Sequence, residues 1–315
     1  MSDQIKISVP ASTSNLGPGF DVLSLALSWY NDFTFKLSDK GLKINLDQDG
    51  TLLLPEDSTN LVYKSFCEPF KKFKKNPPGL ELHIGSKIPL ARGLGSSATA
   101  IVSGLLAANF FLGNPLSKNE ILNMATNIEG HPDNVAAALF GGLTVSVAEG
   151  ENVSMNKLQW PSELLVVVIV PDFDLPTRIA RELLPAKVPY GDAIFNVGCV
   201  SYLLSCLLNK DWEGLKIGFQ DRLHQPYRKD LVPGMDSVLS CAIQKGALGA
   251  TLSGAGPTLV AFINNEQKGH LIGKSMVEKW KEFKVNSIYK VLRSANEGAK
   301  VENLSHVNPH SYNKS

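Results

Sequence analysis

The sequence predicts a mixed fold of strands and helices that is divided into two domains near residue 160. Segments that alternate apolar and polar residues, as strands do, follow segments with the helical repeat along the chain. A polar turn at residues 149–152 interrupts this order, and an apolar run at 164–170 then begins a second set. We therefore expect domains at residues 1–160 and 161–304, followed by a polar tail at 305–315 that frays.

The individual elements can be assigned in order. The first domain has predicted strands at 5–9, 29–37, 80–84 and 143–147, and predicted helices at 60–73, 97–112 and 118–126. The second domain has a predicted strand at 164–170, helices at 192–208 and 235–245, and a strand at 258–264. Because the run 164–170 is too short to span a bilayer and ends at Pro171, it is predicted to be a buried strand.

Composition limits the kind of partner. The chain has 315 residues, of which 43% are hydrophobic, so it can bury a sizeable core. Its formal net charge of +1 gives no reason to expect nucleic acid or an anionic membrane as a partner. The four cysteines form neither a C-x-x-C pair nor a zinc spacing, and the N-terminal residues lack the apolar stretch of a secretory signal. These observations favour a small-molecule partner and a cytoplasmic location.

The most informative segment is residues 89–100, which read PLARGLGSSATA and lead into an apolar, Ala-rich helix pattern. Gly93 and Gly95 allow a positive φ and a close approach to a ligand, and Ser96 and Ser97 offer hydroxyls where the helix begins. Since the first N–H groups of a helix are free, the segment predicts a site for a polyphosphate. The alternative is a helix cap that binds nothing.

Other phosphate-binding motifs fit less well. Residues 93–98 satisfy the G-x-G-x-x-A fingerprint of dinucleotide-binding folds. That fold also needs a second strand ending in an acidic residue about twenty positions later, where this chain has GNPLSKNE, a turn and a helix start. The P-loop lysine motif, the G-x-S-x-G elbow and the protein-kinase motifs do not occur in the sequence.

Two distant segments complete a pattern. Residues 9–21 read VPASTSNLGPGFD and residues 246–258 read GALGATLSGAGPT. Together with residues 89–98, they resemble the three signature motifs of the GHMP kinase superfamily. Residues 129–136 (EGHPDNVA) and 177–185 (TRIARELLP) are similar to segments of the homoserine kinases within it, so the resemblance runs from about residue 5 to about residue 260. The departures are Ser14, where alanine is usual, and Val22 and Ser24, and we expect none of them to touch a polar group of the chemistry.

The resemblance implies an α+β fold of two domains with the active site in the cleft between them. The N-terminal domain would resemble the second domain of ribosomal protein S5, and the C-terminal domain would be ferredoxin-like. ATP and Mg²⁺ are the implied cofactors and L-homoserine is the implied substrate, with a homodimer as the favoured assembly. The implied nucleotide-binding residues are Asn60, Val62, Pro89, Arg92, Gly93, Leu94, Gly95, Ser96, Ser97 and Ala98.

The resemblance also implies roles in catalysis. Ser97 and Glu129 would hold Mg²⁺, although Glu129 seen without its motif would be an exposed acid at a helix end. Asn134 stands where mevalonate kinases use an aspartate base, and an amide cannot accept a proton. Asn134 is therefore expected to orient the substrate hydroxyl, whose proton passes to phosphate or water. His131 is the rival base, but before Pro132 it is expected to be a turn residue held by a hydrogen bond.

A zwitterionic substrate needs a cation for its carboxylate and an acceptor for its ammonium. Arg181 and Arg228 match positions that grip the carboxylate, while Asn15, Asp21, Asn134 and Gly254 match positions that line the amino-acid pocket. Surface salt bridges are the alternative for the two arginines and a helix cap is the alternative for Asp21. Two other functions stay open, namely a GHMP kinase for another small alcohol such as mevalonate, and a non-catalytic nucleotide-binding relative.

Overall fold

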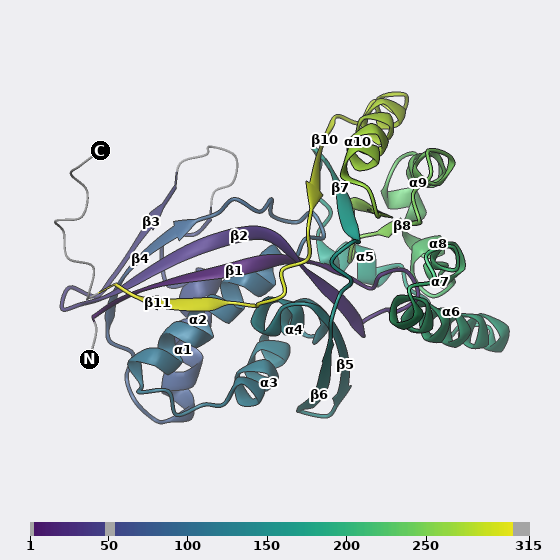
Figure 1. Ribbon diagram of the computed structural model, residues 1–315. Coiled ribbons are helices and arrows are strands. Elements are labelled where there is room, and N and C mark those ends of the chain that lie inside the picture. The colour runs from purple at the N-terminus through teal and green to yellow at the C-terminus, as the bar shows by residue number, and fades with distance from the viewer. Residues whose placement is uncertain (1–2, 48–53, 305–315) are drawn as a thin grey trace.

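The computed structural model describes residues 3–47 and 54–304, which form two lobes that meet side by side (Figure 1). The first lobe contains a 7-stranded sheet and the second a 4-stranded sheet. The predicted α+β fold in two lobes is thus confirmed. The tail expected at 305–315 lies outside the described residues.

The sheet of the first lobe is antiparallel except for the pairing of β3 with β4. The strand order is β11-β1-β2-β4-β3, with β5 pairing both β2 and β6. The strands are β1 (Gln4–Ser14), β2 (Leu23–Ser38), β3 (Leu42–Leu46), β4 (Gly79–Gly85), β5 (Leu143–Glu149), β6 (Asn152–Leu158) and β11 (Lys300–Asn303). All four strands predicted in this half therefore exist, as β1, β2, β4 and β5.

Strand β1 is longer than predicted because the first motif begins inside it. After a bulge between Pro10 and Ala11, residues 11–14 continue to pair with β2. The chain turns away only at Asn15, whose φ of 70° lies in the left-handed region. The motif thus combines a rigid strand with a strained turn.

Four helices cover one face of this sheet (Figure 1): α1 (Leu61–Lys72), α2 (Ser96–Phe111), α3 (Lys118–Glu129) and α4 (Asp133–Phe140). Helix α2 contacts α1, α3, α4 and β1. Because it has protein on most sides, its sequence is apolar nearly all round, as expected for a core helix.

The second lobe has the strand order β10-β7-β9-β8, antiparallel throughout. Its strands are β7 (Leu165–Pro171), β8 (Gly249–Leu252), β9 (Leu259–Ile263) and β10 (Ser287–Leu292). Its helices are α5 (Thr177–Glu182), α6 (Tyr190–Asn209), α7 (Leu215–Gly218), α8 (Gln225–Arg228), the 3-10 turn η1 (Lys229–Leu231), α9 (Met235–Gln244) and α10 (Glu266–Lys281).

Strand β7 explains the apolar run that marks this lobe in the sequence. Leu165, Val167 and Ile169 face a core formed with α9 and α10. Val166 and Val168 face a second core that contains residues of the first lobe. Since both faces of the strand are buried, the usual alternation with polar residues is absent.

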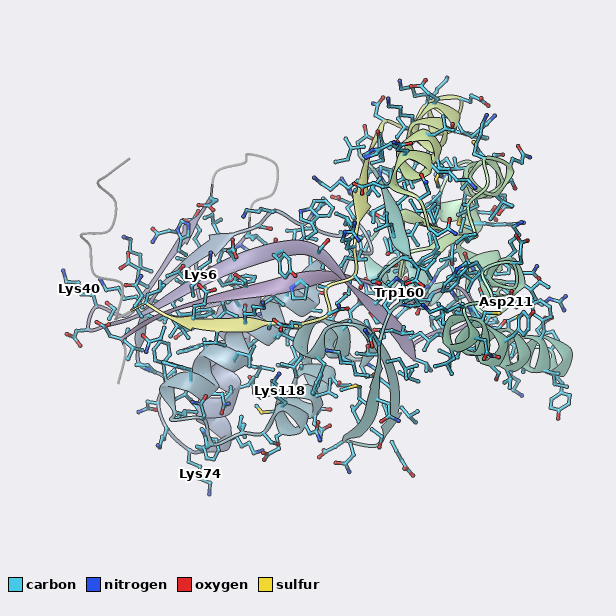
Figure 2. All side chains as sticks on the ribbon, in the orientation of Figure 1. Lys6, Lys40, Lys74, Lys118, Trp160 and Asp211 are labelled. Atoms are coloured by element: carbon cyan, nitrogen blue, oxygen red, sulfur yellow. The ribbon has the colours of Figure 1, made fainter. Side chains whose placement is uncertain are left out.

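The two lobes share this second core. Trp160 lies where they meet (Figure 2), is 1% exposed, and packs against Phe262 of β9. The indole Nε1–H donates to the Leu164 carbonyl at 3.1 Å. Strand β11 then returns to the first sheet and pairs with β1 (Figure 1), so the segment expected as a second domain, 161–304, includes a strand of the first lobe.

Helix α6 carries an exposed apolar face. Among the described residues it is the one helix long and apolar enough to cross a membrane, judged by length and composition only, with 28% of its most apolar stretch buried. One such helix is weak evidence for a span, because a core helix meets the same criteria. Its buried side is formed by Asn196, Cys199, Leu203, Cys206 and Leu207.

Candidate active site

A cavity of about 450 Å³ lies between the two lobes. The first lobe contributes the β1–β2 turn, the loop at residues 90–95 and the starts of α2 and α4, and the second contributes α5, Arg228 and the third motif. Of the predicted site residues, Pro89 and Ala98 do not line it, and all the others do. Residues from motifs more than two hundred positions apart in the sequence therefore meet in one cavity.

The glycine loop takes a left-handed path into helix α2. Gly93 and Gly95 have φ of 72° and 68°. A Cβ on Gly93 would lie 2.2 Å from the Ser253 carbonyl oxygen, and one on Gly95 would lie 2.2 Å from Ser12 Oγ, so both positions require glycine. Gly95 caps α2 with no side-chain hydrogen bond. The N–H groups that begin α2 are thus left for a ligand, and the helix dipole favours an anion there.

The first and third motifs hold this loop in place. Ser253 Oγ donates to the Gly93 carbonyl at 2.6 Å, and it lies 2.8 Å from Thr13 Oγ1. The Gly254 N–H donates to the Ser14 carbonyl at 3.1 Å. On the other side Arg92 pairs with Asp174 of the second lobe. The glycine loop is consequently fixed to both lobes.

Asn60 and Val62 sit at the start of α1. Asn60 Oδ1 accepts from the Val62 N–H at 2.9 Å, so Asn60 is the N-cap of α1. Asn31 also lines the cavity. Its Oδ1 accepts from the N–H groups of Lys87 and Ile88, and this fixes the segment that leads into the glycine loop. Asn31 is not among the predicted site residues, because its contact partners lie more than fifty positions away in the sequence.

Ser97 and Glu129 lie together at the end of the cavity near α2. Ser97 Oγ donates to Glu129 Oε1 at 2.6 Å. Helix α3 ends at Glu129, which brings its carboxylate in front of the start of α2. A carboxylate and a hydroxyl are the oxygen ligands that Mg²⁺ prefers, so this donor set fits that ion.

The carboxamide of Asn134 is held from β1. Its Oδ1 accepts from Ser12 Oγ at 2.8 Å, and its Nδ2 donates to Ser14 Oγ at 2.9 Å. The expectation that Ser14 touches no group of the chemistry is therefore wrong, because the hydroxyl that replaces the usual alanine contacts Asn134 directly. One lone pair of Oδ1 has no protein partner among these contacts and is available to a ligand.

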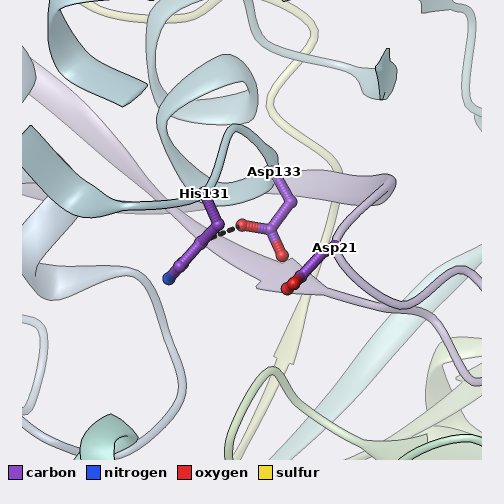
Figure 3. A group of neighbouring side chains, drawn as sticks. All are labelled: Asp21, His131 and Asp133. Carbon is purple, nitrogen blue, oxygen red and sulfur yellow. Dashed lines mark hydrogen bonds and ion pairs between the residues drawn. The ribbon is translucent and has the colours of Figure 1, made fainter. Parts of the chain in front are cut away.

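His131 and Asp133 form a close pair next to Asp21 (Figure 3). His131 Nδ1 lies 2.5 Å from Asp133 Oδ1, and ligand atoms of all three residues lie within 4.8 Å of one another. Burial acts to lower the pKa of His131, but the hydrogen bond and charge of Asp133 and the charge of Glu129 raise it above its ordinary value. The expected hydrogen bond of His131 is present, whereas its partner Asp133 was missed by the sequence analysis.

Asp21 and Arg181 face each other across the lobes. Arg181 donates to both oxygens of Asp21, at 2.6 and 2.9 Å. Asp21 has a φ of 57° in the β1–β2 turn and caps no helix, so that alternative is wrong. The neighbouring Asn15 fixes the turn through its side-chain amide, which donates to the Gly254 carbonyl and accepts from the Asp21 N–H. The pair presents an acid and a fork-shaped cation at one point of the cavity wall.

Arg228 is the most unusual cation of the site. It is 1% exposed, and its guanidinium donates to the carbonyls of Ala180 and Gly254 and to His224 Nδ1, at 3.1, 3.1 and 3.3 Å. No carboxylate pairs with it within 4 Å among the described residues. Burial, and then the charge of Arg181, lowers its pKa to about 10. The surface salt bridge considered for Arg228 is therefore wrong, and a buried cation without a counter-ion faces the cavity.

Comparison with known proteins agrees with this geometry. The chain matches the families described as GHMP kinases N terminal domain, at residues 60–142, and GHMP kinases C terminal, at residues 203–282. The fold and these two matches thus define the protein as a GHMP kinase. A homoserine kinase of Carboxydothermus hydrogenoformans is 45% identical over 92% of this chain and 94% of its own length. One of Halothermothrix orenii is 43% identical over 90% and 91%. The chain belongs to the homoserine kinase family.

Solved structures lead to the same family. A homoserine kinase from Cytophaga hutchinsonii superposes with a TM-score of 0.86 at 33% identity, covering 96% of this chain and 98% of its own. The mevalonate kinase of Methanococcus jannaschii reaches a TM-score of 0.69 at 16% identity, covering 92% and 98%. At that identity the second match shows a common fold and nothing about the substrate.

Proposed function

We propose that this protein transfers the γ-phosphoryl group of ATP to the side-chain hydroxyl of L-homoserine, giving O-phospho-L-homoserine and ADP in threonine biosynthesis. The observation that carries the choice of substrate is Arg228, a buried cation without an ion pair. It lines the same cavity as the free N–H groups of α2. One cavity thus offers places for a polyphosphate and for the carboxylate of a small substrate.

The nucleotide would lie along the first lobe. Asn60 and Val62 would contact the adenine, and the loop from Arg92 to Ser96 would hold the β- and γ-phosphates through backbone N–H groups. Ser97 and Glu129 would hold Mg²⁺, which neutralises the charge that develops on the transferred group when it is bound. The single pair of oxygen ligands suits an ion that keeps several waters.

The amino acid would lie between the lobes. Its carboxylate would accept hydrogen bonds from Arg228 and Arg181, and its ammonium would donate to Asp21. Because Arg181 and Asp21 already pair with each other at 2.6 Å, a zwitterion can insert between them and satisfy both charges. A substrate without an ammonium would leave Asp21 without this second partner, which disfavours mevalonate.

The chemical step requires positioning more than early proton removal. The hydroxyl oxygen forms a bond to the γ-phosphorus while the bond from that phosphorus to the β–γ bridging oxygen breaks. The free lone pair of Asn134 Oδ1 would accept the hydroxyl hydrogen bond and aim the oxygen. The proton then leaves to a phosphate oxygen or water. His131 is the alternative acceptor of the hydroxyl proton. Its raised pKa favours the protonated imidazole, paired with Asp133, and a protonated imidazole cannot accept a proton.

A panel of alcohols tests this function and its rivals. Purified protein with ATP and Mg²⁺ is given L-homoserine, mevalonate or L-serine, and ADP release is followed together with the phosphorylated product. The proposal predicts rapid turnover of L-homoserine alone. Turnover of mevalonate without turnover of L-homoserine would make the protein a kinase for another alcohol, and no turnover of any alcohol would favour a non-catalytic nucleotide-binding relative.

We further propose that the protein works in the cytoplasm as a homodimer. The four cysteines are all free, as is usual in a reducing compartment. The outer face of α6 carries Tyr190, Ile194 and Val197 at 82%, 57% and 66% exposure, which a second copy would cover. Light scattering should give twice the mass of one chain, and the double substitution Ile194→Lys, Val197→Asp should halve it. A monomeric parent protein would contradict the dimer.

A further inference from the structure

His224 lies outside the cavity wall, yet it is fully buried beside the residues that form it. It immediately precedes α8, one helical turn before Arg228, and it is 0% exposed. Its Nε2 lies 2.8 Å from the carbonyl oxygen of Gly17, in the β1–β2 turn. His224 therefore links the turn of the first motif to Arg228 in the second lobe.

The partners of the two ring nitrogens fix the state of the imidazole. A carbonyl oxygen can only accept, so Nε2 must carry the hydrogen that it donates to Gly17. A guanidinium can only donate, so Nδ1 must be unprotonated to accept from Arg228 Nη1 at 3.3 Å. His224 is consequently neutral, with its hydrogen on Nε2.

Stacking adds to this arrangement. The ring of His224 stacks on Phe20 with centroids 5.3 Å apart. Phe20 in turn lies 5.2 Å from the guanidinium carbon of Arg228 and 5.5 Å from that of Arg181. Phe20 thus contacts both cations and the ring of His224, which adds a cation–π interaction to each arginine.

We propose that His224 is a positioning residue for homoserine binding, because its neutral Nδ1 holds the Arg228 guanidinium in the orientation that receives the substrate carboxylate. This inference rests on the proposed function. Two of the three acceptors of Arg228 are backbone carbonyls, which side-chain substitution leaves in place. Among the residues that the structure describes, His224 is the one acceptor of Arg228 that belongs to a side chain, so it can be altered without changing Arg228.

Burial and the charge of Arg228 favour the neutral form of His224, although Asp221 Oδ2 lies 3.6 Å from its Nε2. Burial lowers its pKa, the nearby charge of Asp221 acts in the opposite direction, and the charge of Arg228 lowers it further. Asp21 is the remaining charged neighbour and has a weaker opposing effect. The carboxylate of Asp221 has hydrogen-bond partners other than the imidazole of His224. Its oxygens accept from three backbone N–H groups and one side-chain amide, those of Leu223, His224, Gln225 and Asn196.

Two substitutions separate the two contacts of His224. In His224→Asn, the amide oxygen can take the position of Nδ1 and still accept from Arg228. In His224→Gln, the longer side chain places its amide near the position of Nε2, so it keeps the contact with Gly17 and loses the one with Arg228. The proposal predicts a KM for homoserine that rises about tenfold in His224→Gln and stays within about threefold in His224→Asn, because a hydrogen bond to a charged group contributes about this factor.

The other kinetic constants show whether the effect is one of positioning. The KM for ATP and kcat should change by less than about threefold in both variants, since neither contact reaches the nucleotide or the reacting hydroxyl. 3-Aminopropan-1-ol, which lacks the carboxylate, should show no difference between the parent protein and His224→Gln. If His224→Gln is insoluble, His224→Phe keeps the stacked ring, removes both nitrogens and should give the same rise in KM.

Three results would overturn the inference. These are an unchanged homoserine KM in His224→Gln, an equal rise in both amide variants, or an equal loss for homoserine and 3-aminopropan-1-ol. Each variant is compared with a parent protein that turns over homoserine. Failure of the parent to do so would instead contradict the proposed function, so the two failures can be told apart.

Discussion

Substitution of Arg228 by leucine should separate substrate binding from stability. Arg228→Leu removes the buried cation that we assign to the substrate carboxylate, and truncating one partner of such a pair costs about 2 to 5 kcal/mol. The KM for homoserine should therefore rise by a factor of roughly 30 or more. The KM for ATP should stay unchanged, because the hydrogen bonds of Arg228 go to Ala180, Gly254 and His224 and not to the loop that we assign to the phosphates.

The expected change in folding stability has two opposing contributions. The pKa of Arg228 falls to about 10 because of burial and Arg181, which corresponds to about 3 kcal/mol of unfavourable charge burial that leucine relieves. Against this, the carbonyls of Ala180 and Gly254 and Nδ1 of His224 lose their donor, at about 1 to 3 kcal/mol each. Relief of the buried charge therefore offsets part of the cost of the lost hydrogen bonds, whereas nothing offsets the loss of the cation for homoserine binding.

Coupled measurement of ADP release gives both KM values, and urea unfolding gives the stability. Arg178→Leu is the matched control, since Arg178 lies on α5 near Arg181 but its side chain is 79% exposed and pairs with Glu182 at the surface. That variant should behave as the parent does. An Arg228→Leu protein that is strongly destabilised and keeps its homoserine KM would refute the reasoning, because Arg228 would then be a structural cation.

Three further outcomes are expected. Glu129→Gln should lower kcat and raise the Mg²⁺ concentration needed for half-maximal rate, measured by titration with the metal, and an unchanged titration curve would remove Glu129 from the metal site. Gly95→Ala should weaken ATP binding measured by calorimetry, because its Cβ would lie 2.2 Å from Ser12 Oγ. Gly150→Ala, with a similar φ of 60° and nothing within 4 Å, shows how much of that loss comes from backbone strain alone. Because the folded-state pKa of His224 is lowered, the parent protein should lose stability as the pH falls below about 6.5 by up to about 1.4 kcal/mol per pH unit. His224→Phe should lose less stability over the same pH range. An equal fall in melting temperature between pH 7.5 and pH 5.5 in the two proteins would contradict this.

Much of the fold could be predicted from local patterns. The apolar run that became β7 and the Ala-rich helix α2 are recognisable because burial on several sides removes polar residues from the sequence. Helix α10 was missed although its signals are present, since Asn265 caps it and Ile272 and Met276 repeat at helical spacing. Strand β11 has no such local signal. It is defined by its pairing with β1, which joins residues as far apart in the sequence as Ser8 and Lys300.

The site divides in the same way between local and distant contacts. The glycine loop could be predicted, because glycine at positive φ and a helix start form one continuous segment. The contact of Ser14 with Asn134 joins residues 120 positions apart, so no local pattern reveals it. The pairing of Asp21 with Arg181 spans 160 positions and depends on how the lobes meet. Sequence patterns thus predict which polar residues belong to a site, whereas the fold determines which of them are in contact.

The central claim is that one cavity holds a triphosphate at the start of α2 and an amino-acid carboxylate at Arg228. A crystal structure with L-homoserine and a non-hydrolysable ATP analogue tests it most directly. We expect the γ-phosphate within hydrogen-bond distance of backbone N–H groups between Gly93 and Ser97, and the homoserine carboxylate on the Arg228 guanidinium with its hydroxyl facing Asn134. A nucleotide bound elsewhere, or a homoserine carboxylate that leaves Arg228 without a ligand, would contradict the account.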